Sequence, residues 1–125
     1  MATKINIRAG SVELSGVLND SPTAQEIARI LPIKATVQTW GDEIYFPIPV
    51  KMPLEPDAKE VVSVGDIGYW PRGKCFCLFF GPTPMSKGDE IVPASAVNIV
   101  GKIEGDAKLL KNVKDGEEIL IEAAS

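Results

Sequence analysis

The sequence contains no histidine, and this absence excludes several kinds of catalytic site. Serine hydrolases with a histidine base, two-histidine metal sites and proton relays through imidazole all need that side chain. The chain is also short, and its 125 residues leave room for one domain, which we expect to span residues 1–125. Any function must therefore depend on a small set of other groups.

Long hydrophobic runs are missing as well. The longest uninterrupted apolar stretch runs from Cys75 to Phe80, whereas a membrane-spanning helix needs about 20 such residues. The first ten residues, MATKINIRAG, contain no hydrophobic core of the kind found in signal peptides. We therefore expect a cytoplasmic protein with no membrane partner.

Positive charge is in the minority. Lysine and arginine number 13 against 17 aspartates and glutamates, which gives a net charge of -4. A domain that binds nucleic acid through phosphate contacts needs the opposite balance, so we expect no nucleic-acid partner. The glycines form no phosphate-binding loop with a lysine after it, and we expect no cofactor.

Cysteine is limited to Cys75 and Cys77, which are separated by one residue. On a strand the two side chains would share a face about 6.5 to 7 Å apart, and a disulfide between them would be strained. A zinc site would need two more nitrogen or sulfur ligands, so we expect no metal. The pair is interpreted as small buried hydrophobic residues, with a redox role as the alternative.

Aromatic residues are few, but they are concentrated in two windows of the sequence. The first window contains Trp40, Tyr45 and Phe46, and the second contains Tyr69, Trp70, Phe76, Phe79 and Phe80. The phenylalanines of the second window are expected to fill a core. The tryptophans and tyrosines combine an apolar ring with a polar group, so they suit either a core or the wall of a binding site.

The pattern of short alternating segments and of glycine and proline predicts about eight strands and two helices. The predicted strands cover 4–8, 12–18, 34–40, 43–47, 60–64, 74–80, one or two segments within 91–104, and 117–123. A helix is expected to begin at Ser21-Pro22, with a capping box at Thr23 and Glu26. Its residues Ile27, Ile30 and Leu31 should contact the sheet.

Two further segments carry specific expectations. The strand at 74–80 is apolar on both faces, which is typical of a strand in a closed barrel with a helix or loop packed outside it. A second, short helix is expected after Asp106, with Leu109, Leu110 and Val113 on its apolar side.

Three segments resemble signature segments of a family of short prokaryotic cyclophilin-like proteins, a group generally described as of uncertain function. They are TWGDEIYFPIPV at 39–50, VVSVGDIGYWPRGKCFCLFFGPTPMS at 61–86 and VPASAVNIVGKI at 92–103. The resemblance implies a mainly β fold, a closed eight-stranded cyclophilin-like barrel with two short capping helices.

Prolyl isomerase activity does not follow from this resemblance. True cyclophilins use an arginine on a strand to polarise the substrate amide, and the corresponding segment here, 39–50, contains neither arginine nor lysine. A histidine common at the cyclophilin groove is absent too. Arg72 is the one arginine in an aromatic window, so an atypical peptidyl-prolyl cis-trans isomerase that uses Arg72 or a backbone donor is an alternative.

The leading hypothesis is a non-catalytic or weakly catalytic binding module that holds a small molecule or a peptide in an aromatic groove. Its candidate groove residues are Trp40, Glu43, Tyr45, Tyr69, Trp70, Arg72 and Met85. Glu43 and Asp42 have an alternative interpretation as turn residues, and Met85 as part of a packed loop. A further alternative is that the aromatic surface mediates self-association into a homo-oligomer.

Overall fold

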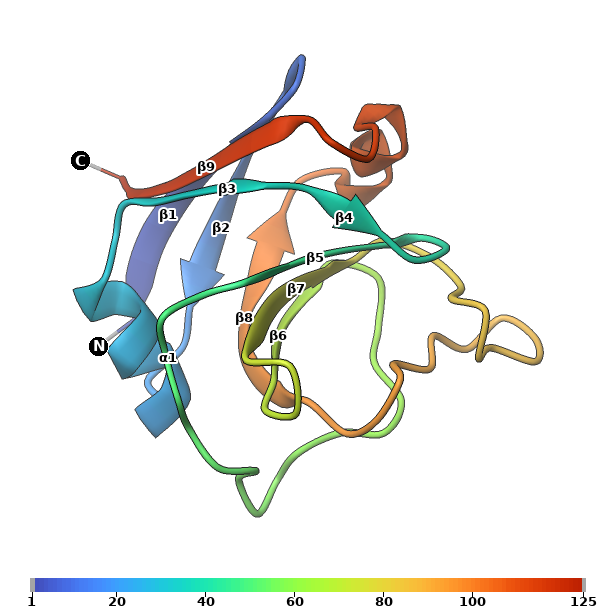
Figure 1. Cartoon of the computed structure of the whole chain (residues 1–125), viewed down its shortest axis with the longest axis horizontal. Helices are drawn as coiled ribbons and strands as arrows, with labels where there is room; N and C mark the ends of the chain where they lie inside the picture. The colour runs from blue at the N-terminus through green and yellow to red at the C-terminus, as the bar shows by residue number, and fades with distance from the viewer. Residues whose placement is uncertain (1, 125) are drawn as a thin grey trace.

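The computed structural model describes residues 2–124, and in this part of the chain nine strands form one sheet that curls into a nearly closed barrel (Figure 1). The elements are β1 (Thr3–Ala9), β2 (Val12–Leu18), α1 (Pro22–Arg29), β3 (Ile33–Thr36), β4 (Gln38–Thr39), β5 (Glu43–Pro47), β6 (Asp66–Trp70), β7 (Cys75–Phe79), β8 (Asn98–Glu104), the 3-10 helix η1 (Ala107–Asn112) and β9 (Glu118–Ala123). The strand order in the sheet is β3-β9-β1-β2-β8-β6-β7-β5-β4, and every pairing is antiparallel.

The barrel closes because one stretch of chain supplies both ends of the sheet. β3 and β4 are the outermost strands in the order, yet only Val37 separates them in sequence. Val37 N donates to Glu117 O at 2.8 Å, and Gly116 N donates to Val37 O at 2.9 Å. The expected strand at 34–40 is therefore divided at Val37, with one half paired to β9 and the other to β5.

The first helix begins where the sequence predicted. The Ser21 side chain accepts from Ala24 N at 3.2 Å, and Pro22 is the first helical residue. The expected capping box is wrong, because Ser21 rather than Thr23 is the N-cap and Glu26 instead pairs with Arg29 at 3.4 Å. Ile27 is fully buried, so the helix covers the barrel through the predicted face.

The second helix, η1, begins at the predicted Asp106 cap, whose side chain accepts from Lys108 N at 3.1 Å. Leu110 and Val113 are buried as expected. Leu109 is 43% exposed, which corrects its placement on the apolar side. The tighter 3-10 winding places residues three apart on one face, so Leu109 cannot share the face of Leu110 and Val113.

Strand β7 is buried on both faces, as its sequence predicted. Phe76 and Leu78 belong to the core inside the barrel, whereas alternate residues point outward. The outward residues form part of a second buried group, the outer cluster, which consists of Val62, Cys75, Cys77, Phe79, Ile91 and Val97. The chain from 81 to 97 covers this cluster, so the barrel has a core inside and a smaller one outside.

The predicted strand at 60–64 is wrong. In this region the structure has only isolated bridges, which join Lys59 to Val97 and Val62 to Ile91. Pro93 lies between the two partner positions, and proline has no N–H for a continuous ladder. Val61 is 52% exposed as a result.

Two buried polar side chains fasten the proline-rich connection between β5 and β6 to the barrel. The Tyr69 hydroxyl donates to Val50 O at 2.5 Å and accepts from Met52 N at 3.3 Å. Asn98 Nδ2 donates to Pro53 O at 3.0 Å. Periodicity cannot reveal such contacts, because their partners are 17 to 45 residues apart.

Candidate functional site

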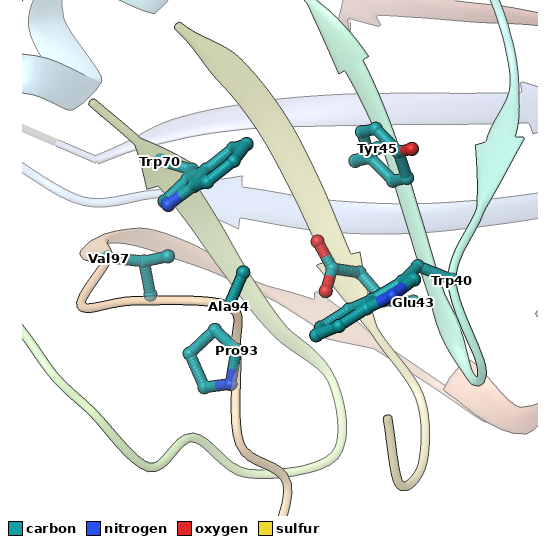
Figure 2. A pocket seen from close by; sticks show the side chains of 7 residues that line it. All are labelled: Trp40, Glu43, Tyr45, Trp70, Pro93, Ala94 and Val97. Atoms are coloured by element: carbon teal, nitrogen blue, oxygen red, sulfur yellow. The ribbon is translucent and has the colours of Figure 1, made fainter. Parts of the chain in front are cut away.

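The candidate site is a pocket of about 230 Å³ on the outer surface of the barrel. It is lined by Trp40, Glu43, Tyr45, Trp70, Pro93, Ala94 and Val97. Glu43 and Tyr45 alternate with the buried Ile44 and Phe46 on β5, so they project outward from the barrel. Figure 2 shows the Glu43 carboxyl between the ring of Trp70 on one side and the rings of Trp40 and Tyr45 on the other.

The hairpin between β4 and β5 brings Trp40 to the pocket. Trp40 N donates to Glu43 O at 2.9 Å, and Gly41 takes a φ of 60° at the turn, a conformation that glycine adopts without strain. The turn is anchored to the next loop, because Asp42 N donates to Pro82 O at 2.9 Å and Phe80 N donates to Asp42 O at 3.0 Å. The turn that carries Trp40 is therefore closed by its own hydrogen bond and anchored to the neighbouring loop through both backbone groups of Asp42.

Trp70 is fixed by a hydrogen bond and by a close approach to backbone. Its Nε1 donates to Ser95 Oγ at 2.6 Å. Its ring lies against Gly73, where an added Cβ would come within 2.6 Å of the ring atoms Cε3 and Cζ3. The glycine thus allows the ring to lie flat on the turn that follows β6.

Substitution of Gly73 by alanine is expected to displace Trp70 and to weaken the outer cluster. The new Cβ would overlap the indole, and relief of that overlap would break the bond to Ser95. We expect a loss of about 1–3 kcal/mol in unfolding free energy and a shift of tryptophan fluorescence. Urea unfolding followed by fluorescence measures both effects, and Gly88→Ala, where a Cβ meets nothing within 4 Å, is the matched control.

Glu43 is the charged group of the pocket. The residue is only 6% exposed, and its Oε1 has no hydrogen-bond partner within residues 2–124. Burial raises the pKa of the carboxyl from 4.5 to about 7, and a hydrogen bond from Cys77 opposes part of that rise. The group can therefore exchange a proton near neutral pH inside an apolar enclosure.

The two cysteines behave differently from reactive thiols. Both are free and buried, and burial raises the pKa of each thiol above its usual value of 9.0, with the nearby Glu43 charge adding to the effect. Both thiols therefore stay protonated at neutral pH, where only the thiolate is an effective nucleophile. Among residues 2–124, no group of three or more histidine, cysteine, aspartate or glutamate side chains is arranged to hold a metal ion.

Four of the seven candidate residues lie together at the pocket: Trp40, Glu43, Tyr45 and Trp70. The other three lie elsewhere. Tyr69 is fully buried inside the barrel, because it precedes Trp70 on β6 and so faces the opposite way. Arg72 is exposed on the turn after β6, and Met85 is 51% exposed on the loop that follows β7.

Sequence reasoning did not select Pro93, Ala94 and Val97, which close the pocket from the loop before β8. Small apolar side chains carry no chemical signal of their own, and their position depends on how this loop folds over the sheet. Gly68 contributes to that fit, since a Cβ there would lie 3.2 Å from Val97 Cγ2.

Comparison with known proteins identifies a family and a similar solved structure. The family model described as Cyclophilin-like matches residues 3–122. The chain is similar to a hypothetical protein from Archaeoglobus fulgidus whose solution structure is known, with 46% identity and a TM-score of 0.83. That likeness covers 98% of this chain and 95% of the archaeal chain. Among curated proteins, none matches the chain.

The helices of the structure are short. None in the described part of the chain has the length and apolar character that would let it cross a membrane.

Proposed function

The chain belongs to the cyclophilin-like family, and from this premise we propose that it is a binding module whose aromatic pocket holds a small molecule or one side chain of a peptide. The observation that carries the proposal is the open space of about 230 Å³ between Trp40, Tyr45 and Trp70. Large aromatic side chains normally fill a core, and here three of them border a space that a ligand can enter.

The size of the pocket limits its ligand. Drug-sized molecules occupy pockets of about 300–1,000 Å³, and an apolar cavity of about 150 Å³ accepts a benzene molecule. A pocket of about 230 Å³ therefore suits a group somewhat larger than benzene. Burial of about 150 Å² of apolar ligand surface would contribute about 4 kcal/mol, which corresponds to a Kd near 1 mM. Larger ligands would bind through one inserted group.

The lining of the pocket favours binding over isomerisation. Rotation about an X-Pro bond is accelerated by weakening the partial double bond of the amide, and a cationic donor can do this. None of the seven lining residues is a lysine or an arginine, and Arg72 is exposed on its turn. We therefore propose ligand binding, and not prolyl isomerisation, as the function of this pocket.

Tryptophan fluorescence and NMR can test the proposal directly, because both tryptophans of the chain line the pocket. Proline-containing peptides and common metabolites should be titrated to tens of millimolar. We expect at least one ligand to shift the resonances of Trp40 and Trp70, and Trp70→Leu to weaken that ligand about tenfold. Met85→Ala, outside the pocket, is the control and should bind normally.

Three results would overturn the proposal. The first is a complete absence of shifts at Trp40 and Trp70 for every ligand in the screen. The second is a protease-coupled peptide assay in which isomerisation is much faster than the uncatalysed process, which takes tens of seconds or longer. The third is self-association through this surface. Light scattering should show a mass independent of concentration, since an increase that Trp70→Ala abolishes would assign the surface to self-association.

A further inference from the structure

We propose that the ligand of this pocket is a small organic cation, an amine whose N–H donates to Glu43 Oε1 while its carbon atoms lie against Trp40, Tyr45 and Trp70. This inference rests on the proposed binding function and adds the chemical class of the ligand. It excludes acidic ligands such as carboxylates and phosphates, which the Glu43 charge would repel.

The unpartnered oxygen of Glu43 is the first observation that carries the inference. Glu43 is 6% exposed as a whole residue, and its Oε1 is buried and has no hydrogen-bond partner among the described residues. Buried polar atoms in folded proteins are nearly always paired, so an unpaired one on a side chain that lines an open pocket points to a donor supplied by a ligand, toward which the carboxyl turns on binding. The Trp70 Nε1–H is already bonded to Ser95, so it does not compete for the carboxyl.

The charge and the rings around Glu43 are the second observation. An ionised carboxylate in an apolar enclosure needs a positive partner, and the pocket lining contains no basic side chain. The faces of tryptophan and tyrosine rings attract cations, most strongly where water is excluded. Figure 2 shows rings on both sides of the carboxyl, so an ammonium group bound to Glu43 would lie among them.

The titratable groups around Glu43 do not replace such a ligand. Asp42 is its neighbour in the hairpin and pairs with Lys111 at 3.8 Å, and neither residue lines the pocket. Tyr45 lies on the same strand, and Cys75 and Cys77 lie on β7, where the neutral Cys77 thiol donates a hydrogen bond to the carboxyl. The loop at 93–97 contains no titratable residue. None of these groups is a cation that could neutralise Glu43.

The inference sets a direction for the effect of pH on binding. A cation favours the ionised form of Glu43, so binding lowers the pKa of the carboxyl below its value of about 7 and releases a proton. Affinity should then be about tenfold weaker at pH 6 than at pH 8. A neutral ligand that accepts from the protonated carboxyl would show the opposite trend.

Cyclopentylamine and cyclopentanol form a matched pair of probes, since they share a ring that fits the pocket and differ in charge. At pH 8 we expect the amine to bind at least tenfold more tightly than the alcohol, as followed by tryptophan fluorescence. Calorimetry in buffers of different ionisation enthalpy should detect the released proton at pH 6.5. Glu43→Gln should abolish the preference for the amine over the alcohol, whereas Glu60→Gln, on an exposed loop, should leave that preference unchanged.

The same measurements distinguish a failure of the cationic-ligand proposal from a failure of the proposed binding function. Equal binding of the two probes, or amine binding that strengthens as pH falls, overturns the cationic ligand and leaves the binding module intact. Failure of both probes at 50 mM also overturns the cationic ligand. The binding function itself fails only if the wider screen of peptides and metabolites leaves Trp40 and Trp70 unshifted as well.

Discussion

Replacing Glu43 by glutamine is expected to stabilise the fold by up to about 3 kcal/mol at pH 8 and by almost nothing at pH 4. Burial raises the pKa of the carboxyl from 4.5 to about 7 in the folded protein. Above pH 7 the group is ionised in both states, and only the folded state bears the cost of a buried charge. Below pH 4.5 it is protonated in both states, and the cost disappears. Glutamine keeps the shape and removes the charge.

Urea unfolding of both proteins at pH 4 and pH 8 measures this difference. The contribution of Glu43 to stability should fall as pH rises from 4.5 to 7, because the folded state binds the proton more tightly than the unfolded state. This is the reverse of the trend for a carboxylate held in a salt bridge. Glu60→Gln controls for removal of one negative charge from an exposed site. Equal stability of wild type and Glu43→Gln at pH 8 would show that the ionised carboxyl is already compensated.

The loss of folding stability caused by ionised Glu43 and the proposed binding function have the same structural origin. The carboxyl lies outside the barrel core, where the aromatic and apolar side chains that line the pocket shield it from water without giving Oε1 a partner. A ligand with an N–H would supply that partner and recover part of the free energy lost in folding. Residues that destabilise the free protein in this way are characteristic of binding and active sites.

The sequence predicted the elements whose signals are local. The hairpins and the strand at 74–80 follow from periodicity, and the helix start follows from Ser21-Pro22. The prediction of a strand at 60–64 was wrong because strand pairing depends on a partner that is distant in sequence, and Pro93 interrupts that partner. Alternation along a strand is visible in a sequence, but which of the two faces becomes the interior is decided by closure of the whole sheet.

At the candidate site, too, the sequence did not reveal which face of a strand would lie inside the barrel. Tyr69 and Trp70 are adjacent aromatic residues with similar chemistry, and the sequence offered no reason to separate them. The register of β6 turns Tyr69 into the barrel, where its hydroxyl bonds to Val50 O, and turns Trp70 toward the pocket. The burial of Glu43 was hidden too, because beside Asp42 it resembles an ordinary turn residue. Its enclosure depends on Pro93 and Val97, some 50 residues away.

Replacing Asn98 by alanine is expected to destabilise the protein by about 3 kcal/mol. Asn98 is fully buried at the start of β8, and its Nδ2 donates to Thr23 Oγ1 and to Pro53 O, each at 3.0 Å. Its Oδ1 accepts from Glu55 N at 2.8 Å. Each buried polar group left without a partner costs roughly 1–3 kcal/mol, and partial hydration of the groups nearer the surface reduces the total.

The same substitution should loosen one particular segment, which distinguishes it from a general loss of packing. Asn98 joins α1 to the connection at 48–60, and Thr23 N and Oγ1 also donate to the Glu55 carboxylate. Hydrogen exchange should therefore accelerate at 52–56 by more than it does in β1.

The Asn98→Asp variant keeps the acceptor for Glu55 N but loses both donors and places a second carboxylate near Glu55, so it should be at least as unstable as Asn98→Ala at pH 7. The exposed Asn112→Ala is the control. Uniform acceleration across the barrel would contradict a local anchor, since the connection at 48–60 would then depend on Asn98 no more than the rest of the fold does.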